Sequence, residues 1–131
     1  MAARIEHLEG TENQKSRAYS PAVITEGGRT IWLAGQTTTV DEAGKDITGD
    51  FEAQARTLFS LMDKTLRRAG GSLANLVTMT VFITDPRYGD PFVKIRAGIF
   101  KDRRFPASAL ITVTAFARPG ILIEIQGVAV V

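Results

Sequence analysis

Apolar residues in the middle of the chain recur at the spacing of an amphipathic helix. From Phe51 to Ala69 they return every three or four positions, and Gly70-Gly71 ends the pattern. That spacing places a single apolar stripe on a helix. Asp50 is a favourable N-cap, and glycine commonly follows a helix end. The sequence therefore predicts a long helix that begins directly after Asp50.

A second, shorter helix is predicted after residue 90. Asp90 followed by Pro91 is typical of an N-cap and a first helical position. The apolar stripe of this helix consists of Phe92, Ile95, Ile99 and Phe100. The helix is expected to end near residues 101–102.

The remaining apolar segments are rich in β-branched residues or alternate with polar ones, which is typical of strands. A short first strand is expected over residues 5–8, followed by a polar loop over 10–17. Residues 18–25 and 30–35 flank Gly27-Gly28 and predict a hairpin. Further strands are predicted over 76–84, 109–116 and 121–131.

This order of elements predicts a single α+β domain over residues 1–131. Two helices can cover one face of a sheet, so the other face needs a partner. Residues 121–131 support this view, because both faces of that strand are expected to be dry. The pattern therefore predicts an oligomer.

The amino-acid composition limits the kinds of site and partner that are expected. The chain has no cysteine and one histidine, His7, which excludes cysteine-ligated metals and makes any metal site unexpected. The net charge of +2 is spread without long runs, so nucleic acid is not an expected partner. No segment approaches the ~20 apolar residues of a membrane span, and residues 1–14 carry no export signal. The expected compartment is the cytoplasm.

Six short segments, in this order, resemble the RidA/YjgF family of reactive-intermediate deaminases. The segments are YSPAV at 19–23, LAGQ at 33–36, Gln54 near the start of the long helix, VFITD at 81–85, FPAS at 105–108 and IEIQGVA at 123–129. The resemblance extends from about Tyr19 to the end of the chain. It implies a chorismate-mutase-like fold, with a six-stranded mixed sheet, two helices on one face, and a homotrimer with ligand clefts between subunits.

The same resemblance implies hydrolysis of 2-imino or 2-enamino acids to 2-keto acids and ammonia, without metal or cofactor. Two charged residues of the family pattern are missing here. Ser108 stands where the family has the arginine that grips a substrate carboxylate, and Gln126 replaces the second acid of the final strand, whereas Glu124 keeps the first. Serine supplies no charge and glutamine no titratable proton. The usual 2-imino acids are therefore expected to bind poorly.

The other cleft candidates are carried over in the same way. Tyr19 matches a tyrosine near the cleft entrance, although a half-buried strand aromatic is an equal interpretation. Gly35 and Gln36 match the backbone that approaches the ligand, and Val93 stands where the family commonly has asparagine. Glu124 belongs either to the cleft or to a polar network at the trimer axis.

Two arginines are candidates to replace the missing one. Arg96 partly shares the apolar stripe of the second helix, and Arg118 lies in the turn before the last strand. Each is either a relocated carboxylate anchor or an arginine whose stem covers apolar surface.

Three functions follow from these residues. The first is a divergent deaminase for an imine, enamine or amino-muconate-like compound that does not need the usual arginine. The second is a trimer that binds a small metabolite without turning it over. The third, ribonuclease activity or translational inhibition, has little support from the balanced charge and the lone His7.

Overall fold

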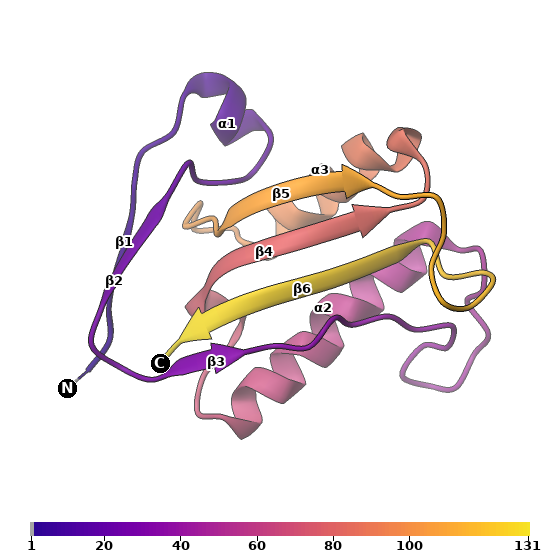
Figure 1. The fold of residues 1–131 in the computed structure, drawn as a ribbon, viewed down its shortest axis with the longest axis horizontal. Helices are drawn as coiled ribbons and strands as arrows, with labels where there is room; N and C mark the ends of the chain where they lie inside the picture. The colour runs from indigo at the N-terminus through magenta and orange to yellow at the C-terminus, as the bar shows by residue number, and fades with distance from the viewer. Residues whose placement is uncertain (1) are drawn as a thin grey trace.

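A computed structural model of the protein describes residues 2–131. In chain order its elements are β1 (Arg4–His7), α1 (Glu12–Ser16), β2 (Val23–Glu26), β3 (Thr30–Trp32), α2 (Phe51–Arg68), the 3₁₀ turn η1 (Leu73–Asn75), β4 (Leu76–Ile83), the 3₁₀ turn η2 (Pro86–Tyr88), α3 (Gly89–Ile99), β5 (Ala107–Thr112) and β6 (Ile123–Val130). Figure 1 shows β5, β4, β6 and β3 side by side with the long helix behind them.

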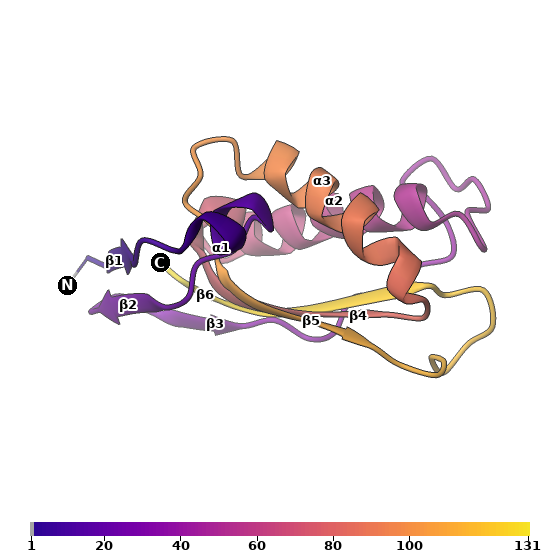
Figure 2. The ribbon, with the colours of Figure 1, turned by 90° about the horizontal axis from the view of Figure 1, so that it is seen from above.

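The predicted α+β class with a mixed sheet and two helices on one face is confirmed. Strand β4 runs parallel to β5 and antiparallel to β6, and β3 joins β6 at the other edge. Helix α3 makes the crossover that the parallel pair β4–β5 requires. In Figure 2 both α2 and α3 lie above the same face of the sheet.

The six strands form two sheets rather than one, so the predicted hairpin of 18–25 with 30–35 is wrong. Strand β2 pairs with β1, and β3 pairs with β6. The chain turns at Gly27 and Gly28, both with positive φ, and the backbone of Arg29 then exchanges hydrogen bonds with Val131. A Cβ on Gly28 would lie 2.5 Å from the carbonyl oxygen of Val131, so that turn needs glycine.

Helix α2 matches its prediction, and the side chain of Asp50 accepts from the backbone N–H of Ala53 as its N-cap. Helix α3 begins at Gly89, because η2 leads directly into it, so the expectation that Asp90 caps it is wrong. Residues 10–17, expected as a loop, contain α1, which starts with a capping box between Thr11 and Gln14.

The last two strands are shorter than predicted. Strand β5 ends at Thr112 instead of residue 116, because its partner β4 ends at Ile83.

The hydrophobic core lies between the four-stranded sheet and the two helices, where Phe59 of α2 stacks on Phe92 of α3.

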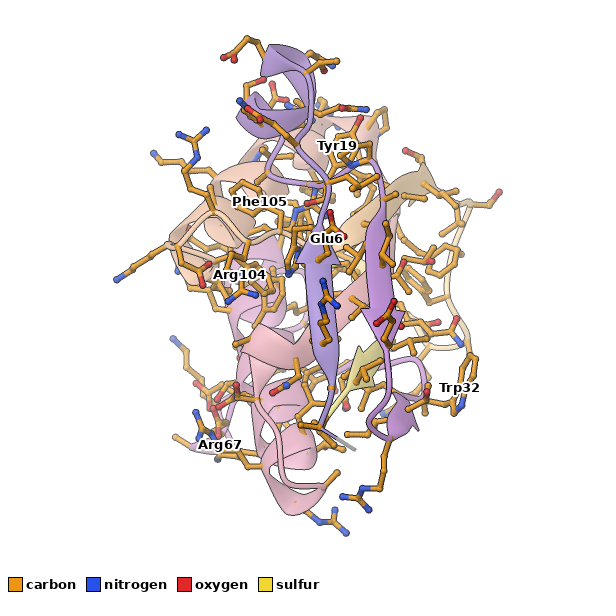
Figure 3. All side chains as sticks on the ribbon, turned by 90° about the vertical axis from the view of Figure 1, so that its left-hand side faces the viewer. Glu6, Tyr19, Trp32, Arg67, Arg104 and Phe105 are labelled. Atoms are coloured by element: carbon orange, nitrogen blue, oxygen red, sulfur yellow. The ribbon has the colours of Figure 1, made fainter. Side chains whose placement is uncertain are left out.

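The sheet face away from the helices is not covered by any element among residues 2–131, so the expectation that both faces of the final strand are dry depends on a partner and stays a prediction. In the single chain Ile123 and Ile125 are buried, whereas Gln126 is exposed. Trp32 of β3 is 79% exposed and projects away from the helices in Figure 3, and Ile111 of β5 is also exposed. This open face therefore presents large apolar side chains that nothing within residues 2–131 covers.

Candidate functional site

A pocket of about 360 Å³ opens between α1, α3 and β5. It is lined by Asn13, Arg17, Tyr19, Val93, Arg96, Ser108 and Leu110. Four of the eight predicted cleft residues, Tyr19, Val93, Arg96 and Ser108, therefore share one pocket. Figure 3 places Tyr19 beside the end of α1.

The loop that carries Tyr19 is tied to the start of β5. Ala18 is fully buried with a φ of 59°, which turns the chain out of α1. The hydroxyl and the backbone N–H of Ser20 donate to the carbonyl oxygens of Phe105 and Pro106, at 2.6 and 3.1 Å. These bonds hold Tyr19 over the strand that carries Ser108.

Arg96 and Ser108 form the centre of the pocket. Ser108 pairs with Met79 in the β4–β5 ladder, so its side chain points to the helix side of the sheet. There its hydroxyl oxygen accepts a hydrogen bond of 2.7 Å from Nη1 of Arg96. Nη2 of Arg96 donates to the carbonyl oxygen of Arg17 at 2.9 Å, and the guanidinium carbon lies 5.0 Å from the centre of the Phe92 ring.

Arg96 is a buried cation without an anion. The side chain is 2% exposed, its Nε has no hydrogen-bond partner, and no carboxylate among residues 2–131 forms an ion pair with it. Burial, and then the charge of Arg17, lower the pKa of Arg96 to about 10, although Tyr19 partly opposes this. Arg96 therefore stays protonated at neutral pH while its partners in the protein are neutral.

An exposed ion pair joins Arg17, which lines the pocket, to Asp90 of α3. Nη1 of Arg17 contacts Oδ1 of Asp90 at 2.6 Å, and their side chains are 36% and 88% exposed. Arg17 and Arg96 together carry two positive charges against the one negative charge of Asp90. The pocket is therefore electropositive.

The other four predicted cleft residues, Gly35, Gln36, Glu124 and Gln126, lie elsewhere. Glu124 and Gln126 pair with Phe82 and Thr80, which face away from the helices, so their side chains lie on the open face. A Cβ on Gly35 would lie 2.7 Å from Oε2 of Glu124, and the backbone of Gln36 bonds with that of Ile125. Within one chain, the sheet separates these residues from Ser108.

Two residues besides the predicted ones line the pocket, and one candidate arginine does not. Arg118 is exposed and does not line the pocket, so Arg96 is the better placed of the two candidate arginines. Arg17 and Asn13 also line the pocket, but the sequence of residues 10–17 predicts only a polar loop and gives no sign of this role. Among residues 2–131 no group of three His, Cys, Asp or Glu side chains is arranged to hold a metal ion.

The helices of residues 2–131 do not include one that is long and apolar enough to cross a membrane.

Comparisons with known proteins relate nearly the whole chain to one protein family. The family model described as Endoribonuclease L-PSP matches residues 11–131. Protein DfrA of Myxococcus xanthus is 31% identical over 114 residues, which are 86% of this chain and 84% of that protein. A RutC family protein of Sulfurisphaera tokodaii is 26% identical over 112 residues, or 78% of this chain and 88% of its own length.

Solved structures agree with this placement. The protein YyfB of Yersinia pestis, of unknown function and from the conserved Rid protein family, is 25% identical with a TM-score of 0.84, and all of both chains is covered. A member of the YjgF/YER057c/UK114 family from Mycobacterium tuberculosis is 29% identical with a TM-score of 0.68, over 98% of this chain and 100% of that one. With the family model matching nearly its whole length, this chain belongs to the RidA/YjgF family.

Proposed function

We propose that this protein is a homotrimeric, cofactor-free deaminase that hydrolyses an imine or enamine in clefts between its subunits. The observation that carries the proposal is the division of the predicted cleft residues between two faces of one sheet. Tyr19, Val93 and Ser108 line the pocket, whereas Glu124 and Gln126 lie on the open face. Both groups can reach one ligand if a second copy of the chain supplies one of them.

The open face supports an assembly of several copies. Trp32 and Ile111 are exposed there, and Val128 pairs with Trp32 at the same edge of the sheet. Apolar side chains on a sheet face favour burial against another layer. The resemblance to the RidA/YjgF family favours three copies around one axis.

The proposed reaction needs few groups. Water adds to the carbon of the C=N bond, a proton moves to the nitrogen, and the C–N bond breaks to give a carbonyl compound and ammonia. Glu124 is the one carboxylic acid among the predicted cleft residues, so it is the proposed proton carrier, supplied by a neighbouring copy. Gln126 cannot transfer a proton, but its amide can orient the attacking water.

A binding protein without catalysis is the second candidate. It is favoured by the lining of the pocket, which within residues 2–131 includes no carboxylate and no imidazole. Under this alternative the cleft holds a small metabolite, and no ammonia is released. Cleavage of RNA remains the third candidate, and the +2 net charge gives it no additional support.

The test is ammonia release from freshly generated imino acids and amino-muconate-type compounds, with light scattering to count the subunits. We expect a trimer that releases ammonia. Glu124→Gln should lower the rate by about 10²-fold or more if Glu124 carries the proton. Glu52→Gln on the outer surface of α2 is the matched control and should change nothing. A trimer that binds these compounds without releasing ammonia would favour the second candidate.

A further inference from the structure

We propose that Arg96 and Ser108 together form an anchor for a carboxylate, so that the pocket takes a small carboxylic acid carrying one negative charge. The pocket lies in the region where the proposed function places the substrate. The inference rests on the proposed function as far as the reaction is concerned, whereas binding of a carboxylate does not depend on it. Position 108 holds a serine in place of the arginine of the family pattern. The guanidinium of Arg96, from α3, nevertheless reaches the hydroxyl of this serine.

The first argument is charge. Transferring an unpaired cation into a protein interior is costly, and buried arginines are normally paired with carboxylates. Arg96 is 2% exposed and has only a hydroxyl oxygen, a carbonyl oxygen and an aromatic ring as partners within residues 2–131. Two of its five N–H groups are used, and its Nε–H is unpaired. A bound carboxylate would supply the missing negative charge.

The second argument is the direction of the Ser108 hydroxyl. Its oxygen accepts from Arg96, so the hydroxyl proton is free to be donated elsewhere. Within residues 2–131 the hydroxyl approaches the carbonyl oxygen of Ala109 at 3.5 Å, which is too far for a good O–H···O bond. A ligand oxygen in the pocket can therefore accept from Ser108 while Arg96 polarises that hydroxyl.

The third argument is the shape and lining of the pocket. Val93 and Leu110 provide apolar walls, and Tyr19 provides an aromatic one. The volume of about 360 Å³ lies at the small end of ligand pockets. These walls suit a short aliphatic or aromatic acid, and the single net positive charge of Arg17, Arg96 and Asp90 suits one carboxylate better than two.

The test uses benzoate and butanoate as probes, with benzamide and butanamide as uncharged controls of the same shape. Binding to the full chain is followed by NMR titration, including the Nε–H resonance of the Arg96 side chain. We expect the two acids to shift this resonance and the two amides to leave it in place. Its assignment comes from Arg96→Lys, in which it disappears.

Variants separate an anchor from a structural arginine. Arg96→Met keeps most of the side-chain volume and should weaken benzoate binding by about tenfold to hundredfold, without weakening benzamide. Ser108→Ala should weaken benzoate by about threefold to tenfold. Arg96→Lys keeps the charge and should retain part of the affinity. Arg118→Met, an exposed arginine outside the pocket, is the control and should bind as the unaltered chain does.

Two results would overturn the proposal. One is benzoate binding to Arg96→Met with undiminished affinity. The other is an Arg96 resonance in the unaltered chain that does not respond to either acid, and this result does not depend on any variant folding. If acids bind through Arg96 but no imine is hydrolysed, the proposed function fails and the anchor stands. If ammonia release survives in Arg96→Met and this variant binds benzoate with undiminished affinity, the anchor fails and the function stands.

Discussion

Gln54 and Arg96 are both buried polar side chains on the two helices that cover the sheet, yet their surroundings differ. Gln54 is fully buried, and its Nε2 donates to the carbonyl oxygens of Ile47 and Gly120 at 3.0 and 2.8 Å. Its Oε1 accepts from the backbone N–H of Leu122 at 2.9 Å. Arg96 keeps its Nε–H unpaired and its charge uncompensated.

The difference indicates two kinds of role. Gln54 has a partner for each side-chain hydrogen-bonding atom, and those partners come from two loops that α2 holds together. It contributes to stability alone. The hydrogen-bonding capacity and charge of Arg96 exceed what the other residues of 2–131 supply, which is expected of a group that meets a ligand. Substitution of Gln54 should therefore lower stability and leave ligand binding unchanged. Substitution of Arg96 should weaken ligand binding and raise stability.

The largest effect is expected from Gln54→Leu. It keeps the approximate size of the side chain but leaves the backbone N–H of Leu122 unpaired. It also removes one hydrogen bond to each of the carbonyl oxygens of Ile47 and Gly120, which keep backbone partners. Since an unsatisfied buried group costs about 1–3 kcal/mol and a lost hydrogen bond about 1 kcal/mol, the free energy of unfolding should fall by about 3 kcal/mol, as measured by urea denaturation. Benzoate affinity should not change in the fraction that remains folded.

Arg56→Leu on the exposed side of the same helix serves as the control and should change stability by no more than about 0.5 kcal/mol. An equally small loss for Gln54→Leu would show that the two loops do not depend on these hydrogen bonds.

A smaller effect, of opposite sign, is expected from Arg96→Met. The lowering of the pKa of Arg96 to about 10 corresponds to a cost of about 3 kcal/mol for holding the buried charge, since one pKa unit is about 1.4 kcal/mol. Losing the bonds to Ser108 and to the Arg17 carbonyl offsets about 2 kcal/mol of this. The variant should therefore be more stable by about 1 kcal/mol in urea denaturation near neutral pH. A loss of stability would show that Arg96 is chiefly structural.

The pH dependence of this difference provides a further check. Because the folded-state pKa of Arg96 is lowered to about 10, the unfolded chain binds this proton more tightly in the pH window from about 10 up to the ordinary pKa of arginine. The cost of the buried charge is fully present below that window and declines as pH rises through it. The advantage of Arg96→Met should therefore be larger at about pH 8 than at about pH 10.5, when both proteins are unfolded in urea. A constant advantage would contradict the lowered pKa.

Much of the fold could be predicted from local pattern. The spacing of apolar residues predicted α2, and the β-branched run predicted β4, because both elements bury side chains at regular intervals. The partners of β2 and β3 could not be predicted in this way. The same Gly27-Gly28 turn is compatible with a hairpin or with two separate strands, and the choice depends on pairing with β1 and β6, which are distant in sequence.

The site was predictable only in part, for a related reason. The FPAS segment predicted that Ser108 lies in a cleft, and four of the predicted residues do share a pocket. The contact between Arg96 and Ser108 depends on how α3 packs over β5. The contact between Arg96 and the carbonyl oxygen of Arg17 joins residues that are 79 positions apart. Neither contact leaves a local pattern in the sequence.

The smallest stability effect is expected from Asp90→Asn, because the exposed Arg17–Asp90 pair is worth at most about 0.5 kcal/mol. Its effect on binding should still be measurable. Removing Asp90 leaves two positive charges at the pocket, so benzoate should bind about twofold to threefold more tightly at low salt, and the gain should fade as salt rises. The control is Asp102→Asn, which lies outside this pocket. Unchanged benzoate affinity in Asp90→Asn would mean that the charge of Asp90 does not reach the ligand, and that Arg96 and Ser108 hold the carboxylate without help from Arg17.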